Sequence, residues 1–310
     1  MTSTTLELLQ KYSVPGPRYT SYPTAPYFRT DFGEADWAAA LTASAADRGL
    51  SLYAHIPFCD SLCYYCGCNM VATRDYSKTQ PYLAYLDQEM ARTAQRVDPA
   101  RVARQLHWGG GTPTYLNPGD IRRLMAMMRR HFTLAPDAEI SCEVDPRELT
   151  RAHLEALRES GFNRLSFGVQ DMDPAVQQAV NRIQSAALIQ QVLDWSRELG
   201  FSSINLDLIV GLPKQTVASF SRTLEQVVAW APDRLAVFSY AHVPWLKKHQ
   251  NLIQEADLPD SAMRLGLHQA VNEALGAAGY VNIGFDHFAR PEDELVRAQR
   301  NKTQIGRAHV

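Results

Sequence analysis

The sequence predicts an α/β fold: a partial (βα)6 TIM-like barrel with an N-terminal extension. Two observations predict it. Six short apolar segments recur along the chain, and longer segments with the periodicity of amphipathic helices lie between them. An alternating order of strands and helices implies a parallel sheet with helices outside it. Right-handed crossovers then curve six such units into part of a barrel.

The elements follow in chain order. The expected strands cover residues 52–56, 105–108, 138–144, 164–169, 203–210 and 234–240. The expected helices cover residues 81–97, 118–131, 150–160, 186–199 and 216–230. Pro118 and Thr150 suit helix starts, while Gly161 and Gly200 come just after helix ends. We expect residues 1–45 to form an extension near the active site, 46–290 the core barrel, and 291–310 the start of a C-terminal region.

Composition narrows the class of protein. The chain has 310 residues, is 45% hydrophobic and 21% charged, and carries a net charge of −2. These values are ordinary for a globular protein. The composition does not indicate a basic surface, so it does not predict a nucleic-acid partner. No apolar stretch approaches the ~20 residues of a membrane span. Residues 1–9 lack the pattern of a signal peptide, so we expect a cytoplasmic protein with reduced cysteines.

Four of the five cysteines lie within ten residues, and the first three follow the pattern C-x3-C-x2-C. They are Cys59, Cys63, Cys66 and Cys68. Three thiolates on one loop can hold three irons of a [4Fe–4S] cluster and leave the fourth iron open. S-adenosylmethionine (SAM) can chelate an open iron through its amino and carboxylate groups. An electron from the cluster then breaks the sulfonium and releases a 5′-deoxyadenosyl radical.

Other uses of cysteine fit less well. A structural zinc site usually draws its ligands from two C-x2–4-C pairs far apart in sequence, whereas these four share one loop. Disulfide frameworks belong to small secreted chains. Cys142 lies apart from the others in a strand-like segment, and we interpret it as a buried, inert cysteine.

Chemically distinctive residues lie near or just after the C-terminal end of each expected strand. In strand order they are the cysteine loop, the glycine-rich turn 109–113, the carboxylates Glu143 and Asp145, then Gln170, Asp207 and the segment 240–242. Barrels of this class place their active site at the C-terminal ends of the strands, so we expect these residues to meet. Each has a structural explanation when it is taken alone: a glycine run can mark a turn, and Asp207 can be a buried, paired carboxylate.

Several motifs together carry a family resemblance. They are the cysteine-containing run 55–68 and the segments 17–25, 107–116, 143–148, 161–171, 207–216 and 285–291. From about residue 12 to about residue 300, the chain resembles the radical SAM superfamily and, within it, the oxygen-independent coproporphyrinogen III oxidases (coproporphyrinogen dehydrogenases). The glycine motif alone is shared across the superfamily, whereas the set is specific.

The resemblance implies a reaction. In this family the 5′-deoxyadenosyl radical abstracts a β-hydrogen from a propionate, and the substrate radical loses CO2 and one electron to leave a vinyl group. Two propionates react, which converts coproporphyrinogen III to protoporphyrinogen IX in haem synthesis. The implied cofactors are one [4Fe–4S] cluster and two SAM molecules. An unidentified low-potential electron donor is the expected partner, and we expect a monomer.

The resemblance also implies roles for individual residues. Cys59, Cys63 and Cys66 would bind the cluster, and Cys68 would act near the second SAM without being a ligand. Tyr53, Gly110 and Glu143 would contact the first SAM. The second SAM would contact Tyr65, Gly111, Thr112, Gln170, Arg182, Asp207 and Ala241.

Two arginines in this set have ordinary alternatives. Arg18, in the proline-rich segment 15–24, would pair with a substrate propionate, although such a segment is also typical of a surface linker. Arg182 would pair with a SAM carboxylate in a bidentate fork, and its alternative is a solvated helix arginine.

Two departures qualify the resemblance. The family continues well past residue 300 with a C-terminal domain, and residues 305–310 do not resemble it, so we expect a truncated reading frame with a non-native end and doubtful activity.

The nearest alternative is a related haem chaperone, which typically lacks the segment 17–24 and carries Phe at the position of Cys68. Both features favour the dehydrogenase. A zinc-stabilised structural module is the second alternative.

Overall fold

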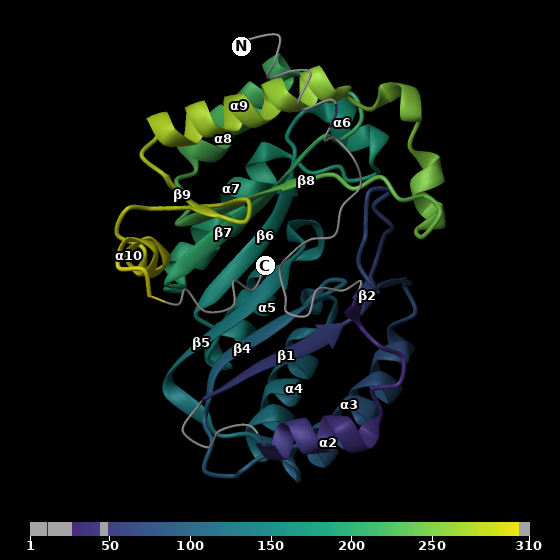
Figure 1. The fold of residues 1–310 in the computed structure, drawn as a ribbon, viewed down its shortest axis with the longest axis vertical. Coiled ribbons are helices and arrows are strands. Elements are labelled where there is room, and N and C mark those ends of the chain that lie inside the picture. Colours follow the sequence, from purple (N-terminus) through teal and green to yellow (C-terminus); the bar gives the residue numbers. More distant parts are fainter. Residues whose placement is uncertain (1–10, 12–26, 44–48, 304–310) are drawn as a thin grey trace.

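The computed structural model describes residues 11, 27–43 and 49–303. Six parallel strands form an open, curved sheet (Figure 1). They are β1 (Leu50–Ile56), β4 (Ala103–Gly110), β5 (Leu134–Val144), β6 (Arg164–Gln170), β7 (Ser203–Val210) and β8 (Arg234–Ser239). Neighbouring strands pair in chain order from β1 to β8, as right-handed βαβ units require. The predicted partial (βα)6 barrel is confirmed, and each expected strand overlaps one of these six.

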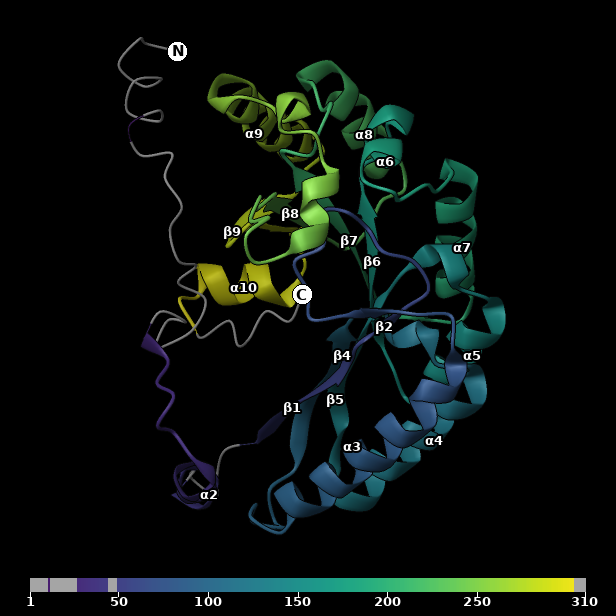
Figure 2. The ribbon, with the colours of Figure 1, turned by 90° about the vertical axis from the view of Figure 1, so that its right-hand side faces the viewer.

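Five helices cover the outer face of this sheet (Figure 2). They are α3 (Thr79–Ala94), α4 (Pro118–His131), α5 (Arg151–Glu159), α7 (Ala186–Glu198) and α8 (Val217–Ala229). Local capping fixes their starts. The Asn117 side chain accepts from the backbone N–H of Asp120, and Thr216 forms a capping box with Ser219. All five predicted helices are present, with ends that differ by up to three residues.

The main core lies between the sheet and these helices. Trp108 from β4 is fully buried and meets the ring of Phe162 edge to face, with 4.8 Å between ring centroids. Cys142 is also fully buried and not in a disulfide, which confirms its expected burial. The core therefore holds the strands rigidly, so the loops at their C-terminal ends start from fixed positions.

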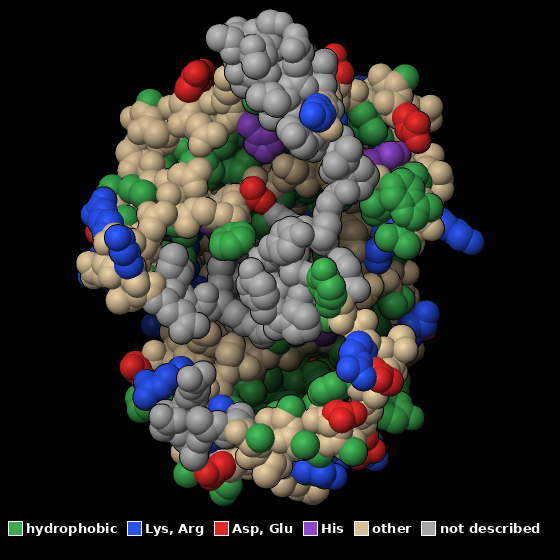
Figure 3. Space-filling view, viewed as in Figure 1, with side chains coloured by type: hydrophobic (Ala, Val, Ile, Leu, Met, Phe, Trp, Pro, Cys, Tyr) green, Lys and Arg blue, Asp and Glu red, His purple; other side chains and the backbone are tan. Residues whose placement is uncertain are grey.

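Several elements were not predicted. Beyond β8 the sheet continues with β10 (His287–Ala289) and then β9 (Val281–Gly284), both antiparallel to their neighbours. The remaining elements are α2 (Glu34–Ala43), β2 (Phe58–Cys59), β3 (Val71–Ala72), α6 (Pro174–Ala179), α9 (Ser261–Ala277) and α10 (Glu294–Arg300). In the space-filling view, Lys and Arg side chains gather over α10 at the left edge (Figure 3). In the described part of the chain no helix combines the length and apolar character that a membrane span requires.

Candidate active site

A cavity of about 470 Å³ opens at the C-terminal ends of the six parallel strands. Most of the residues predicted for the site line it: Cys59, Cys63, Tyr65, Cys66, Cys68, Gly110, Gly111, Thr112, Glu143, Gln170, Arg182, Asp207 and Ala241. Tyr53 is not among the lining residues, and Arg18 lies outside the described residues. The C-terminal ends of the parallel strands therefore bring together residues that are up to 182 positions apart, from Cys59 to Ala241.

The cysteine loop is closed at its base by backbone pairing. β2 and β3 run parallel, with Phe58 opposite Val71. The Val71 N–H donates to the Pro57 carbonyl oxygen at 2.7 Å, and the Thr73 N–H donates to the Cys59 carbonyl oxygen at 2.9 Å. This pairing holds the three predicted cluster ligands on one tight loop.

A second segment, residues 247–250, holds the loop from the opposite side. The Lys247 Nζ donates to the Cys68 carbonyl oxygen at 2.9 Å, and the His249 Nε2 lies 2.7 Å from the Cys66 carbonyl oxygen. Gln250 contacts the same loop. The sequence motifs do not include these residues, because nothing in their local sequence shows that they reach a loop about 180 positions away.

The glycine-rich turn packs directly against the start of that loop. The Gly111 N–H donates to the Ile56 carbonyl oxygen at 2.8 Å. A Cβ atom on Gly111 would lie only 2.5 Å from the Pro57 carbonyl oxygen. Gly110 has a φ of +120° and sits against the His55 ring. Both positions need glycine, because a side chain would separate the turn from the cysteine loop.

The thiols of the cysteine loop differ in acidity. A hydrogen bond with Cys68 lowers the pKa of Cys66 to about 6, and the same bond raises the pKa of Cys68 well above its usual range. Burial raises the pKa of Cys59 to about 12, although a bound metal ion deprotonates a coordinating thiol.

The described residues do not converge on a single metal ion. None of their His, Cys, Asp and Glu side chains form a group of three or more around one ion. In a [4Fe–4S] cluster each thiolate binds a different iron, so three thiols spread over one loop fit a cluster.

An ion-paired group lies behind Cys63. Asp145 accepts from Arg147 Nη2 at 2.6 Å and from Arg182 Nη1 at 2.9 Å. Although burial alone would raise it, the pKa of Asp145 falls well below its usual range because Arg182 and Arg147 stabilise the carboxylate. Arg182 is buried and follows α6, so the alternative of a solvated helix arginine is wrong.

Arg182 is held more tightly than the sequence indicated. Its Nη1 faces Asp145 and its Nη2 donates to the Gly168 carbonyl oxygen at 2.6 Å. Only its Nε is left without a hydrogen-bond partner. A bidentate fork to a ligand carboxylate would therefore require Arg182 to exchange one of these bonds.

The cavity floor carries Glu143 and Asp207, two of the three carboxylates that line the cavity. Asp207 accepts from the Ser166 hydroxyl at 3.0 Å and from the Asn205 amide at 2.7 Å. Burial, and then the nearby charge of Glu143, raise the pKa of Asp207 to about 7. Glu143 accepts from the Gly110 N–H at 3.1 Å. Such carboxylates can accept from ribose hydroxyls or an ammonium group.

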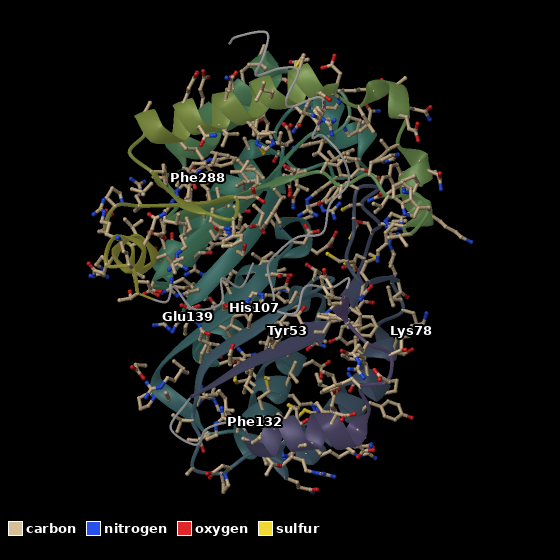
Figure 4. The ribbon with its side chains drawn as sticks, in the orientation of Figure 1. Tyr53, Lys78, His107, Phe132, Glu139 and Phe288 are labelled. Atoms are coloured by element: carbon tan, nitrogen blue, oxygen red, sulfur yellow. The ribbon has the colours of Figure 1, made fainter. Side chains whose placement is uncertain are left out.

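Tyr53 belongs to a layer next to the cavity. It lies opposite His107 in the β1–β4 pairing, and their rings stack with 5.8 Å between centroids (Figure 4). The Tyr53 hydroxyl lies 3.0 Å from His55 Nδ1, while His107 Nε2 lies 3.2 Å from Glu143. Tyr53 is half exposed, so its ring stays accessible from outside the cavity.

Gln170 places an unpaired, buried oxygen on the cavity wall. It ends β6 with a φ of +64°, at a point where the β6–β7 register shifts. Its Oε1 is buried on the cavity wall without a hydrogen-bond partner. Strained backbone and unsatisfied buried polar atoms both cluster at ligand sites. Together with the Nε of Arg182, this oxygen suits a polar ligand such as SAM.

These features define a radical SAM protein. The sequence pattern of the radical SAM superfamily matches residues 53–227. Because the match covers more than half of the chain, the chain belongs to this superfamily. Its members use a [4Fe–4S] cluster and SAM, the two groups that the cysteine loop and the cavity fit.

Individual relatives are more specific. The chain is 52% identical to the oxygen-independent coproporphyrinogen III oxidase of Escherichia coli (strain K12), over 95% of this chain and 64% of that protein. It is 48% identical to the Pseudomonas aeruginosa protein of the same name, over 96% and 65%. The solved structure of coproporphyrinogen III oxidase from Escherichia coli superposes with a TM-score of 0.90 at 51% identity, covering 95% of this chain and 66% of that one.

The chain thus spans just under two thirds of the length of these relatives.

Proposed function

We propose that this chain forms the catalytic core of an oxygen-independent coproporphyrinogen III dehydrogenase. It would decarboxylate two propionates of coproporphyrinogen III oxidatively, giving protoporphyrinogen IX in the cytoplasm. One observation carries the proposal: 52% identity to the Escherichia coli oxidase extends over 95% of the chain. The cavity residues carried over from the family support it, because almost all of them meet at one place.

The cysteine loop and the glycine-rich turn would hold the cluster and the first SAM. Cys59, Cys63 and Cys66 would bind the cluster, with Tyr53, Gly110 and Glu143 at the first SAM. Held by these residues, the cluster and SAM would supply the radical chemistry of the reaction. Glu143 accepts from the Gly110 N–H, so its remaining lone pairs can take an ammonium donor.

The other predicted residues of the cavity would hold the second SAM. Its proposed contacts are Tyr65, Gly111, Thr112, Gln170, Arg182, Asp207 and Ala241, with Cys68 beside it. Gln170 Oε1 and Arg182 Nε are the buried atoms ready for such a ligand. Arg18, outside the described residues, would pair with a substrate propionate.

The proposal includes organisation and partners. Residues 1–45 would lie along the active site, 46–290 would form the core, and 291–310 would begin a further region. A low-potential electron donor, still to be identified, would reduce the cluster, and the protein would act as a monomer without nucleic acid or membrane.

Anaerobic reconstitution with iron and sulfide tests this proposal. We expect a [4Fe–4S]+ EPR signal after reduction, with a shape that changes when SAM is added. Formation of 5′-deoxyadenosine and of a tricarboxylic or divinyl product, detected by chromatography after incubation with SAM, a reductant and coproporphyrinogen III, would then support the reaction itself. Stoichiometric haem binding without SAM cleavage would favour the chaperone instead, and colourless protein containing zinc would favour the structural module.

A further inference from the structure

We propose that Arg147 is a further residue of the cluster site and that it sets the reduction potential of the cluster. Its guanidinium group would hydrogen-bond the Cys63 sulfur and stabilise the reduced cluster, while Asp145 limits that effect. This inference rests on the proposed function, because it requires a cluster bound through Cys63. Neither the cysteine motif nor the residues carried over from the family include Arg147 or Asp145.

The contacts place two cations at one thiol. Arg147 Nη2 lies 3.4 Å from Cys63 Sγ, and Arg182 Nη1 lies 3.5 Å from the same atom. Both guanidinium groups also face Asp145 Oδ2, at 2.6 and 2.9 Å. One sulfur and one carboxylate oxygen therefore share the same two arginines.

The charges in this group do not cancel. Two guanidinium groups carry two positive charges and Asp145 carries one negative charge, which leaves one net positive charge among these three side chains, while Asp60 and Arg74, the nearby pair, carry opposite charges. The side chains of Arg147 and Asp145 are only 15% and 14% exposed. Water therefore screens this charge weakly, and its effect on a neighbouring cluster is large.

Reduction adds a negative charge to a cluster that thiolates already make electron-rich. Hydrogen bonds to the sulfurs and nearby positive charge favour that added electron, which raises the reduction potential. Arg147 is well placed to do this because it is fixed from both ends. Its backbone N–H donates to Asp145 Oδ1 at 3.0 Å, and its Nη1 reaches the Asn181 carbonyl oxygen at 3.5 Å.

Opposite charge changes should move the potential in opposite directions. Arg147→Gln removes a positive charge and should lower the potential, with an expected tenfold fall in the equilibrium constant for reduction, which is about 59 mV for one electron. Arg147→Lys keeps the charge and should give a smaller fall. Asp145→Asn removes the negative charge and should raise the potential. A role in loop structure alone would not give opposite signs.

Arg164 provides a matched control. Its side chain is 17% exposed and pairs with Glu139 and Glu294, but it stands at the start of β6, at the other end of the strand from the cavity. Arg164→Gln therefore removes a similarly buried, ion-paired arginine. Its cluster should keep the wild-type potential.

The experiment is an anaerobic redox titration of the reconstituted 310-residue protein without SAM. Dithionite and mediator dyes set the potential, and EPR follows the [4Fe–4S]+ signal. Opposite shifts in Arg147→Gln and Asp145→Asn, with Arg164→Gln unchanged, support the assignment.

Other outcomes overturn it. If the wild-type protein forms a SAM-responsive cluster, and Arg147→Gln and Asp145→Asn both keep the wild-type potential, the role of Arg147 is overturned. The proposed function then stays intact. If Arg147→Gln takes up no cluster, the potentials of Arg147→Lys and Asp145→Asn test the assignment instead. Potentials equal to that of the wild type in both variants reject it. A wild-type protein that forms no cluster would overturn the proposed function and this inference with it.

Discussion

Gln250 donates from its side-chain Nε2 to the backbone carbonyl oxygen of Tyr65 at 3.0 Å, although 185 residues separate them. Gln250 is fully buried, and its Oε1 accepts from the Val243 N–H at 2.6 Å. The segment after β8 is therefore tied to the cysteine loop that follows β1. This bond links the first and last parallel strands of an open sheet across its cavity.

Replacing Gln250 should loosen the cysteine loop. Gln250→Leu keeps similar bulk but leaves the Tyr65 carbonyl and the Val243 N–H unsatisfied, which costs about 1–3 kcal/mol for each buried group. We expect a lower free energy of unfolding in urea for the cluster-free protein and faster loss of iron from the reconstituted protein. Asn251→Ala, at the exposed neighbouring position, should change neither. Equal iron loss in the two variants would contradict the link.

Two glycines should respond to alanine with opposite signs. In Gly111→Ala the new Cβ would meet the Pro57 carbonyl oxygen at 2.5 Å and the Phe58 carbonyl oxygen at 2.7 Å, so the backbone must move. We expect a lower melting temperature and a lower yield of reconstituted cluster. Gly276 lies within α9, where a Cβ atom would meet nothing within 4 Å, and Gly276→Ala should stabilise the protein by roughly 0.5–1 kcal/mol. Destabilisation in both variants would show that space is not the cause.

The five cysteines should separate into two groups. Alanine at Cys59, Cys63 or Cys66 should abolish the iron–sulfur absorbance and EPR signal, because each thiolate would hold a different iron. Cys68→Ser and Cys142→Ala should retain the cluster, since Cys142 is enclosed in the core and Cys68 is proposed to lie at the second SAM. Iron and sulfide analysis, with EPR, measures this. A Cys68→Ser protein without a cluster would make Cys68 a ligand.

The sequence predicted what depends on local pattern. The bounds of α4 and β7 were correct to the residue, because capping at Asn117 and a clear apolar run define them. The meeting of Glu143, Gln170 and Asp207 followed from topology alone, since parallel strands present their C-terminal ends at one edge.

What the sequence did not predict depends on long-range partners. Arg147 looks like an ordinary loop residue until Cys63, 84 positions away, lies beside it. The β9–β10 hairpin has strands of only four and three residues, too short for periodicity to reveal. The stacking of the Tyr53 ring on His107 likewise depends on the β1–β4 pairing, while the role of Tyr53 at the first SAM stays a prediction.

Asp207 should make the stability of the cluster-free protein depend on pH. Its pKa in the folded protein is about 7, raised first by burial and then by Glu143, whereas in the unfolded chain the same carboxyl should titrate near 3.9. Between these values the folded protein holds a proton that the unfolded chain has lost. The favourable contribution is therefore complete at about pH 4 and is lost as the pH rises towards 7.

Asp207→Asn removes this titration while keeping the shape of the side chain. The difference in unfolding free energy, variant minus wild type, should increase from pH 4.5 to pH 7.5, by about 1.4 kcal/mol for each unit of pKa shift. Urea unfolding at half-unit pH steps measures it. Asp194→Asn, on the outer surface of α7, reports the general effect of removing a carboxylate. If the Asp207→Asn difference stays flat across this range, then Asp207 is ionised in the folded protein at all these pH values, and the cavity floor is better solvated than its burial indicates.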